Sequence, residues 1–475
     1  KLSKDDLVAF RDRFNIPVSD AQIDDLPFVK PEVDSAEMKY FLGQREKLGG
    51  SLPQRSDDAP KLEIPALDIF KAQLAGTGER EISTTMAFVR MLTALTRDKK
   101  IGKNIVPIVP DEARTFGMEG MFRQIGIYSS KGQLYEPQDA DQLMYYREDK
   151  SGQILEEGIN EAGSACSWIA AGTAYANYGV SMIPFYIYYS MFGFQRIGDF
   201  VWAGADMQTR GFLMGGTAGR TTLAGEGLQH QDGHSLVLSS TIPNCISYDP
   251  CYAYELAVII HDGLRRMYAE QENVFYYLTC MNENYAHPAM PEGAEQGILK
   301  GMYKLKQSDN AQVQLMGSGT ILREVEKAAE ILAADYNINS DIWSVTSFSE
   351  LRRDGLSVER WNALHPDETP KQSFVSQSLQ GLEDQTFVVS TDYMKVVPDQ
   401  IRQWIPGDYH VLGTDGFGRS DDRRSLRRYF EVDAEHVVVT TLYALQQQGK
   451  VKAEVVKQAI KKYGIDPERV EPDKG

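Results

Sequence analysis

Short apolar runs alternate with helical segments along most of the chain. Runs rich in β-branched and aromatic residues predict buried strands at 104–109, 182–190, 245–248 and 274–279. Between these runs, apolar residues recur at helical spacing in 112–125, 161–176, 192–209 and 251–270. Alternation of strands and helices predicts a parallel sheet with helices on both faces.

A second alternation follows the break "HPAMPEG" at 287–293. The runs "QVQLMGSG", "DIWSVTSF", "TFVVST" and "HVLGTD" predict strands, and helices are expected at 320–335, 422–430 and 436–448. The predicted class is therefore α/β, with two three-layer domains and mainly parallel sheets, at 61–290 and 291–475. Residues 1–60 are polar with scattered Pro and Gly, and predict an extended connector or wrapping arm.

Length and charge narrow the class of protein. The 475 residues exceed what one hydrophobic core normally serves. A net charge of −17, from 67 acidic and 50 basic residues, argues against nucleic acid or an anionic membrane as the main partner and fits a cytosolic protein. No run approaches the roughly 20 apolar residues of a membrane span. Because the chain begins "KLSKDDLVAF" without Met, we expect a fragment or a proteolytic core.

The four cysteines form no C-x-x-C pair. This pattern favours buried free thiols in a reducing compartment over disulfides or metal sites. His230 and His234 form the one close histidine pair, which by itself does not favour a metal site.

Four segments place polar groups at the ends of predicted strands, where open α/β sheets bind ligands. Their candidate residues are Asp111, Glu112 and Arg114; Glu161; Tyr189, Phe192, Phe194 and Arg196; and Glu226, His230, Asp232 and His234.

Each candidate has a structural alternative. Asp111 and Glu112 fit a helix cap, and Glu161 fits a first-turn acid with Asn160 as the cap. Phe192 and Phe194 fit core positions, while the two histidines of the Gly-rich loop fit a solvated surface.

Two further segments are weaker candidates for binding. The turn "GSGT" at 317–320 precedes a helix, as in phosphate-binding turns. The arginines of 413–430 fit an anion site, a docking surface or, more simply, a solvated helix face.

Taken together, the segments resemble a known family. The motifs "DEARTFGMEGMFRQIGIYS", "EDKSGQILEEGINEAG", "IPFYIYYSMFGFQRIGD", "GGTAGRTTLAGEGLQHQDGHS", "TIPNCISYDP" and "GTDGFGRSD" are similar to those of the homodimeric bacterial pyruvate dehydrogenases. That family belongs to the transketolase-like group of thiamine diphosphate enzymes, and the resemblance runs along nearly the whole chain.

The resemblance implies an order of domains. The span 61–290 matches a pyrimidine-binding domain, 291–475 matches the C-terminal domain, and 1–60 matches the connector that leaves a diphosphate-binding domain. The G-D-G…N-N signature of that last domain, which supplies the Mg²⁺ ligands, is incomplete here because the chain contains no G-D-G. We therefore expect about half of the enzyme and no metal ligands in this chain.

The resemblance also implies roles for particular residues. Glu161 matches the glutamate that hydrogen-bonds a ring nitrogen of the cofactor's aminopyrimidine and so activates the cofactor, in a tight pocket lined by small residues. Phe192 matches the aromatic residue that stacks on the pyrimidine. Arg196 and Tyr189 match residues that line the active centre.

Three more roles follow from the resemblance. Asp111 and Glu112 also match residues that line the active centre, and the work implied for them, as for Tyr189 and Arg196, is to position pyruvate and shuttle protons. His230 matches an active-centre histidine that suits proton transfer near neutral pH, and His234 is expected to order the surrounding loop.

The implied reaction is decarboxylation of pyruvate, followed by reductive acetylation of the lipoyl group of a dihydrolipoyl acetyltransferase. The implied assembly is a cytoplasmic bacterial homodimer. Two alternatives stay open: a transketolase or another 2-oxo acid decarboxylase, and a catalytically silent fragment or scaffold that retains dimer contacts.

Overall fold

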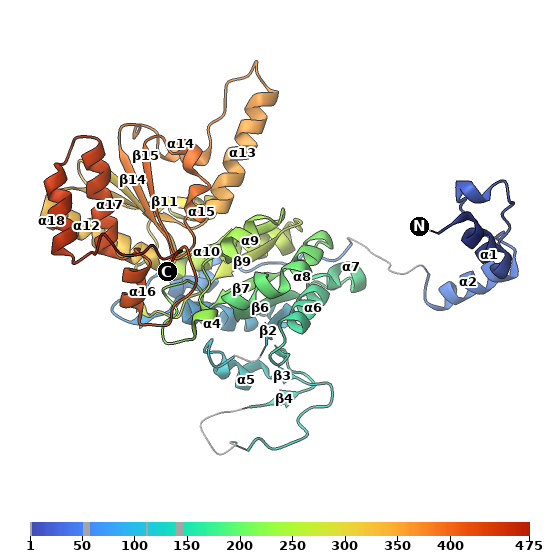
Figure 1. Cartoon of the computed structure of the whole chain (residues 1–475). Helices are drawn as coiled ribbons and strands as arrows, with labels where there is room; N and C mark the ends of the chain where they lie inside the picture. The colour runs from blue at the N-terminus through green and yellow to red at the C-terminus, as the bar shows by residue number, and fades with distance from the viewer. Residues whose placement is uncertain (1, 51–57, 111–112, 139–145) are drawn as a thin grey trace. The chain divides into compact units, whose positions relative to one another are not determined.

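The structure is a computed structural model that describes residues 2–50, 58–110, 113–138 and 146–475. The chain divides into two compact units, Lys1–Asp57 and Asp58–Gly475, and each is described by itself (Figure 1).

The first unit contains two α-helices. Its elements are α1 (Lys4–Phe14), the 3-10 turn η1 (Ile23–Asp25) and α2 (Ala36–Lys47). Ser3 and Asp6 form a capping box at the start of α1, and the Ser35 hydroxyl accepts from the Met38 N–H at the start of α2. The expectation of an extended segment was therefore wrong for these two stretches, because serine caps start helices there. The role as a connector stays a prediction.

The second unit contains a six-stranded sheet in which every neighbouring pair is parallel. In spatial order its strands are β5 (Leu155–Glu156), β2 (Ile105–Val109), β6 (Ile183–Tyr189), β7 (Phe212–Gly216), β9 (Phe275–Thr279) and β8 (Cys245–Tyr248). Four of these strands lie where the sequence predicted them, and β5 and β7 were not predicted.

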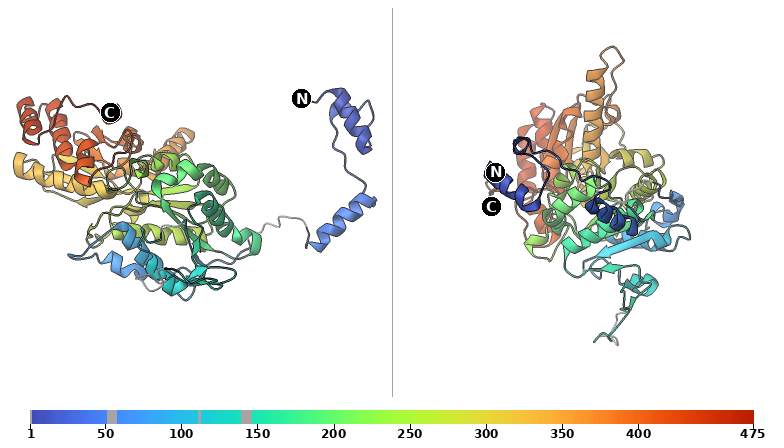
Figure 2. Two further views of the ribbon diagram at one scale, coloured as in Figure 1. Left: turned by 60° about the horizontal axis from the view of Figure 1, so that its bottom comes forward. Right: turned by 90° about the vertical axis from the view of Figure 1, so that its right-hand side faces the viewer.

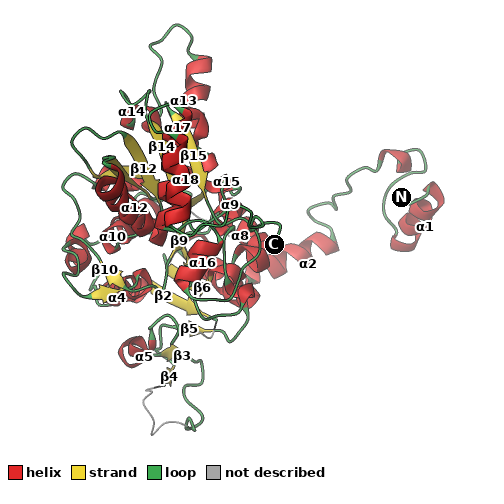
Figure 3. Cartoon of the chain, turned by 60° about the vertical axis from the view of Figure 1, so that its left-hand side comes forward, coloured by secondary structure: helices red, strands yellow, loops and turns green. Residues whose placement is uncertain are grey.

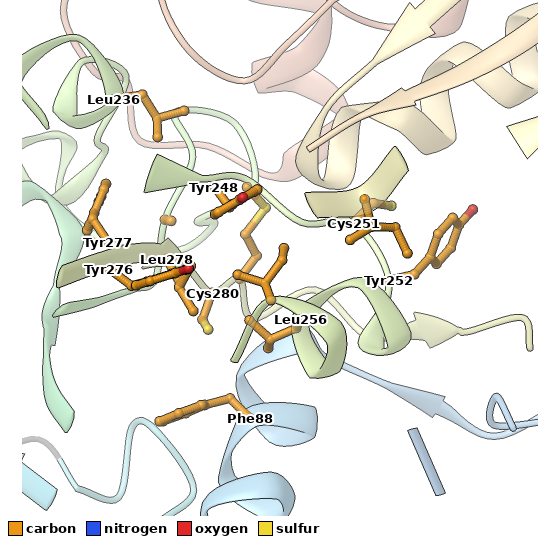
Figure 4. Packing of buried hydrophobic residues seen from close by; sticks show 14 of the residues in the cluster. Phe88, Leu236, Tyr248, Cys251, Tyr252, Leu256, Tyr276, Tyr277, Leu278 and Cys280 are labelled. Atoms are coloured by element: carbon orange, nitrogen blue, oxygen red, sulfur yellow. The ribbon is translucent and has the colours of Figure 1, made fainter. Parts of the chain in front are cut away.

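One face of this sheet packs against α4 (Thr84–Thr96) and α10 (Ala253–Leu264). Phe185 stacks on Phe212 with ring centroids 4.4 Å apart and lies 5.8 Å from Phe88 of α4. Figure 4 shows Phe88, Leu256 of α10 and Leu278 of β9 gathered in this core. Burial of these rings and aliphatic side chains supplies most of the stabilisation of the layer.

The opposite face packs against α6 (Glu161–Gly172) and α8 (Phe194–Asp206). Trp168 of α6 meets Phe275 edge-on at 5.4 Å, and Phe194 of α8 meets Tyr277 edge-on at 4.9 Å. Helices therefore cover both faces, as the three-layer prediction required.

Shorter elements complete this domain. They are η2 (Leu67–Phe70), α3 (Lys71–Leu74), η3 (Gly102–Asn104), α5 (Glu119–Ile125), α7 (Ala174–Tyr178), η4 (Ser190–Phe192), η5 (Leu228–His230), α9 (Ser235–Ser240), the π-helix η6 (Arg265–Ala269) and α11 (Glu295–Lys300). Two strand pairs lie outside the main sheet: β1 (Glu81–Ile82) with β10 (Tyr285–Ala286), and β3 (Ile127–Tyr128) with β4 (Glu148–Asp149). The pair β3–β4 projects from the domain (Figure 2).

A five-stranded sheet follows in the C-terminal domain, and its edge strand β11 is antiparallel to the rest. Its spatial order is β11 (Met302–Lys306), β13 (Ser340–Val345), β12 (Val313–Gly317), β14 (Thr386–Ser390) and β15 (Asp408–Leu412). Both main sheets lie inside the predicted spans, while the boundaries at 60/61 and 290/291 stay predictions.

Helices cover both faces of the second sheet as well (Figure 3). On one face α12 (Leu322–Tyr336) and α17 (Ala434–Gln447) pack together. On the other face the Tyr409 hydroxyl of β15 donates to the Pro398 carbonyl of α15 (Val396–Asp399) at 3.0 Å. The helices and turns are η7 (Gly319–Ile321), α12 (Leu322–Tyr336), α13 (Phe348–Leu364), α14 (Phe374–Ser378), α15 (Val396–Asp399), η8 (Arg402–Trp404), α16 (Arg423–Tyr429), α17 (Ala434–Gln447) and α18 (Ala453–Lys462).

Within the described part of the chain, no helix combines the length and the apolar character needed to cross a bilayer.

The two sheets meet at their carboxyl ends through a buried aspartate. Asp249, which follows β8, accepts hydrogen bonds from the Thr279 hydroxyl at 2.6 Å and the Ser318 hydroxyl at 2.8 Å. Its backbone carbonyl accepts from the Gly319 N–H at 3.1 Å. The turn "GSGT" is thus buried. The Ser318 hydroxyl and the Gly319 N–H are used on Asp249 and the Thr320 hydroxyl on Met281 Sδ, so the phosphate-binding interpretation of this turn is wrong.

The arginine-rich segment also contributes to the junction between the domains. Arg427 is 5% exposed; it pairs with Glu283 and lies 3.1 Å from Glu324. Arg323 pairs with Glu283 at 2.9 Å. The solvated-face interpretation was therefore wrong for Arg427, because its acidic partners lie far away in the sequence.

The four cysteines are free thiols. Cys245, Cys251 and Cys280 are buried, as predicted, but Cys166 is exposed. Burial raises the pKa of the Cys245 thiol to about 12, so this thiol is inert at neutral pH.

We predict that Asp249 makes stability depend on pH. Burial raises the pKa of Asp249 to about 7, against the hydrogen bonds from Thr279 and Ser318 that lower it. A carboxyl whose folded pKa exceeds its unfolded value of about 3.9 stabilises the fold when protonated. That stabilisation is complete below about pH 4 and is lost as the pH rises to about 7, with a total of up to about 4 kcal/mol.

Asp249→Asn keeps the shape of the side chain and removes the titration. Relative to the parent protein, its free energy of unfolding in urea should rise between about pH 4 and about pH 7. A difference between the two proteins that stays constant with pH would contradict the burial argument.

Candidate active site

Polar and aromatic candidates gather at the carboxyl end of the first sheet. β6 ends at Tyr189, the turn η4 follows, and α8 begins at Phe194. The neighbouring strand β2 ends at Val109. Ligand sites of open α/β sheets lie at this end of the strands, so the topology brings the predicted residues to one edge.

Glu161 is the first residue of α6, and its position depends on the helix cap. The Asn160 side chain accepts a hydrogen bond from the Gly163 N–H at 3.0 Å. A Cβ at position 163 would lie 2.6 Å from Asn160 Nδ2, so glycine leaves room for this cap. The positive end of the helix dipole stabilises the carboxylate charge at this position.

Arg196 joins Glu161 to an aromatic ring. Its Nη1 donates to a Glu161 carboxylate oxygen at 2.8 Å, and the Glu161 side chain is 13% exposed. The guanidinium carbon of Arg196 lies 4.0 Å from the centroid of the Phe192 ring, a cation–π contact. A carboxylate, a cation and an aromatic face therefore lie side by side.

Two further rings extend this arrangement. The ring centroid of His230 lies 5.1 Å from that of Phe192 and 5.4 Å from that of Tyr189. Tyr189 also contacts Phe116 at 5.8 Å. We call Glu161, Arg196, Phe192, Tyr189 and His230 the ring cluster.

Burial separates the candidates from their structural alternatives. Phe194 is 6% exposed in the core, as its core interpretation predicted. Phe192, Tyr189 and His230 are half-buried, so they belong neither to the core nor to a freely solvated surface. Such partly exposed rings suit contact with a flat ligand.

Asp232 fixes the loop that follows His230. The side chain is fully buried, and its Oδ1 accepts from the N–H groups of His234 and Ser235, each at 3.0 Å. Its Oδ2 accepts from the hydroxyl of Ser190, which also hydrogen-bonds the Tyr277 hydroxyl at 2.9 Å. One carboxylate thus connects the histidine loop with the turn between Tyr189 and Phe192.

His234 lies beside this carboxylate rather than in the ring cluster. Its Nδ1 is 3.7 Å from Asp232 Oδ1, and its buried Nε2 has no hydrogen-bond partner among the described residues. Burial lowers the pKa of His234, against the Asp232 charge that raises it. The neutral imidazole therefore packs within the loop, and the loop-ordering role expected for it stays a prediction.

Three further predicted residues remain. Asp111 and Glu112, which follow β2, lie outside the described residues. Arg114 is exposed.

The sequence analysis missed Phe116, Ser190 and the bonding role of Asp232. Asp232 stands three residues before Ser235, which is the spacing of a helix cap, and this signal would have revealed half of its role. Its bond to Ser190 spans 42 residues and has no local signature.

Two further features of the described residues concern metal ligands and cavities. Over the described ranges, no three His, Cys, Asp or Glu side chains come together as metal ligands. A cavity of about 650 Å³ lies in the C-terminal domain, lined by residues that include Tyr336, Gln385 and Lys450. The ring cluster offers carboxylate, cation and aromatic chemistry.

Solved structures define the class of fold. A transketolase from Leishmania mexicana matches with a TM-score of 0.60 at 16% identity, covering 94% of this chain and 55% of that chain. A transketolase from Campylobacter jejuni matches with a TM-score of 0.58 at 14% identity, covering 93% of this chain and 59% of that chain. The chain has a transketolase-like α/β fold.

Sequence comparison narrows this class. The family model of the pyruvate dehydrogenase E1 component middle domain matches residues 62–288, and that of the transketolase-like C-terminal domain matches 301–433. The pyruvate dehydrogenase E1 component of Pseudomonas aeruginosa is 62% identical over 99% of this chain and 54% of its own length. That of Escherichia coli K12 is 58% identical over 99% of this chain and 53% of its own length.

The chain belongs to the pyruvate dehydrogenase E1 component family. It spans about half the length of the curated relatives it matches.

We predict that Asp232→Ala destabilises the unit by about 2–4 kcal/mol, because it leaves two backbone N–H groups unpaired in the interior and removes the acceptor of the Ser190 hydroxyl. Asp232→Asn keeps an oxygen for the two N–H groups and should cost about 1 kcal/mol. Urea unfolding monitored by tryptophan fluorescence gives both values, and equal costs for the two variants would show that the side-chain oxygen is not what holds the loop.

Proposed function

We propose that this chain supplies the aminopyrimidine-binding half of a thiamine diphosphate site. The whole enzyme would be a pyruvate dehydrogenase E1 that decarboxylates pyruvate and reductively acetylates the lipoyl group of a dihydrolipoyl acetyltransferase. The observation that carries this proposal is the Glu161 carboxylate at the start of α6, beside the Phe192 ring and bridged to it by Arg196.

The residues present fit an aminopyrimidine ring. Phe192 and His230 pack edge-to-face with ring centroids 5.1 Å apart, and a half-buried aromatic face of this kind suits stacking on a flat heterocycle. Among the described side chains, Arg196 is the one that donates to the Glu161 carboxylate, and it reaches one of the two oxygens. The second oxygen is available to hold a ring nitrogen that carries a proton.

Bound thiamine diphosphate supplies the electron sink for cleavage of a 2-oxo acid. The chain's own residues hold, orient and move protons. Glu161 accepts a hydrogen bond from the heterocycle, and Arg196 fixes the orientation of that carboxylate. Tyr189 and His230 face the same cluster, where a hydroxyl and an imidazole serve proton transfer near neutral pH. Asp111 and Glu112 are proposed to line the active centre beside pyruvate.

The remaining parts of the proposal concern groups beyond this chain. The diphosphate and its Mg²⁺ would be held by a domain that lies outside it. The proposed assembly is a homodimer in the bacterial cytoplasm, and the proposed partners are pyruvate and the lipoyl-bearing acetyltransferase, with neither nucleic acid nor membrane.

Two alternatives make different predictions. A transketolase-type enzyme would act on sugar phosphates instead of pyruvate. A silent scaffold would keep its fold and dimer contacts and bind no cofactor even when a diphosphate-binding domain is present.

The test is a calorimetric titration with thiamine diphosphate and Mg²⁺. The chain is titrated alone and together with a separately produced diphosphate-binding domain of the family. We expect Glu161→Gln to weaken binding about tenfold or more, since a charged hydrogen bond is lost. Pyruvate turnover with an artificial electron acceptor should fall by about 10²-fold or more.

The matched control is Glu119→Gln, because Glu119 is also a first-turn glutamate, in α5, and is exposed. It should bind and turn over like the parent protein. Equal binding by the parent and Glu161→Gln would refute the role of Glu161. Turnover of sugar phosphates alone would favour the transketolase alternative, and no binding in either sample would favour the scaffold.

A further inference from the structure

The loop that carries His230 rests on the C-terminal domain. Asp392, which follows β14 and is fully buried, accepts from the N–H and hydroxyl of Thr221 at 2.8 and 2.7 Å. Its other oxygen accepts from the N–H and hydroxyl of Thr222 at 3.0 and 2.6 Å. Four donors around one carboxylate compensate for its burial. The start of the loop is therefore fixed by a residue of the second sheet.

The loop 413–421 of the C-terminal domain contacts the following part of the loop that carries His230. The Ser420 hydroxyl donates to the Glu226 carbonyl at 2.7 Å, and the Arg220 guanidinium donates to the Gly416 carbonyl. A Cβ at position 418 would overlap the carbonyl oxygen of Leu228, the first residue of η5. Glycine at 418 therefore lets this loop lie directly against the turn that ends in His230.

Gln231 connects the two loops. Gln231 is 1% exposed. Its side-chain Oε1 accepts a hydrogen bond from the Arg419 N–H at 2.7 Å, and its Nε2 donates to the Leu223 carbonyl at 2.9 Å. Both polar atoms are used on backbone groups, one on each side of the domain junction. The residue is the immediate neighbour of His230.

The contacts of His230 within its own domain leave its position less defined. Its N–H donates to the Gly227 carbonyl at 2.9 Å, inside the same turn. Its ring meets the Tyr189 ring at a tilt and the Phe192 ring edge-on, and its Nδ1 lies 3.3 Å from the same Gly227 carbonyl. The hydrogen bonds that join this turn and its flanks to a segment distant in sequence come from Ser420 and Arg419 of the C-terminal domain.

We propose that Gln231 is a positioning residue through which the C-terminal domain places the His230 imidazole against Phe192 and Tyr189. The catalytic meaning of that placement rests on the function proposed above, whereas the placement itself does not. A displacement of about 1 Å at a reacting group lowers turnover by about 10²-fold. Through this contact, the position of the C-terminal domain therefore affects the turnover at the site of the first sheet.

The experiment compares Gln231→Ala with Gln229→Ala. Gln229 is exposed and lies two residues away on the same turn, so it is a matched control. The full chain is labelled with ¹³C at the histidine rings, and the His230 resonance among the seven histidines is identified by its loss in His230→Asn. We expect Gln231→Ala to shift or split this resonance and Gln229→Ala to leave it unchanged.

A second pair approaches the contact from the other domain. Gly418→Ala pushes on the Leu228 carbonyl and should perturb the same resonance. The neighbouring Phe417, 79% exposed, gives the control Phe417→Ala. If Gln231→Ala fails to fold, Gly418→Ala still tests the proposal, and an unmoved His230 resonance in a folded variant of either kind overturns it.

Activity distinguishes this inference from the proposed function. In the enzyme completed by its diphosphate-binding domain, Gln231→Ala should lower kcat about tenfold, with an unchanged KM for pyruvate, because binding groups stay in place. A shifted resonance without any cofactor binding in the parent would support the positioning contact and refute the proposed function. Full activity in Gln231→Ala would overturn the inference alone.

Discussion

The carboxyl ends of the two sheets meet, and two buried aspartates hold them together. Asp249 follows β8 and accepts a hydrogen bond from the turn after β12. Asp392 follows β14 and accepts hydrogen bonds from the segment after β7. Each carboxylate is removed from water and is surrounded by hydroxyl and N–H donors. Loss of these donors would leave a buried charge uncompensated, which is far more costly than the loss of an apolar contact. The junction is therefore specific as well as stable.

This constraint explains how residues distant in sequence form one site. Parallel pairing brings the carboxyl ends of β2 and β6 to one edge of the sheet, and α6 begins at the same edge with Glu161 as its first residue. At the domain junction, residues of the C-terminal domain hold the segment 219–231 against that edge through hydrogen bonds. Glu161, Phe192 and His230 consequently belong to three separate segments whose relative positions depend on both domains.

The sequence predicted the class of fold and most of the buried strands, because apolar runs bounded by polar turns mark such strands directly. It missed β7, whose short run "FLMGG" ends in two glycines that look like a loop. Five residues of the site were candidates from their places at the ends of predicted strands: Glu161, Phe192, Arg196, Tyr189 and His230. The family motifs supplied their expected roles, and the structure places them together.

The polar connections had no such signal. Asp392 and Thr221 are 171 residues apart, and Gln231 and Arg419 are 188 apart. These residues acquire their roles only through contacts between the two domains. Local patterns of hydrophobic and polar residues do not predict which residues make such contacts. The same reason explains why Arg427 and the turn at 317–320 were misinterpreted.

The measurement that tests the account most directly is a crystal structure of the chain with its diphosphate-binding domain, thiamine diphosphate and Mg²⁺. The account predicts the aminopyrimidine ring against Phe192, with a ring nitrogen within hydrogen-bonding distance of the Glu161 carboxylate. A cofactor bound with its pyrimidine away from Phe192 and Glu161 would contradict it.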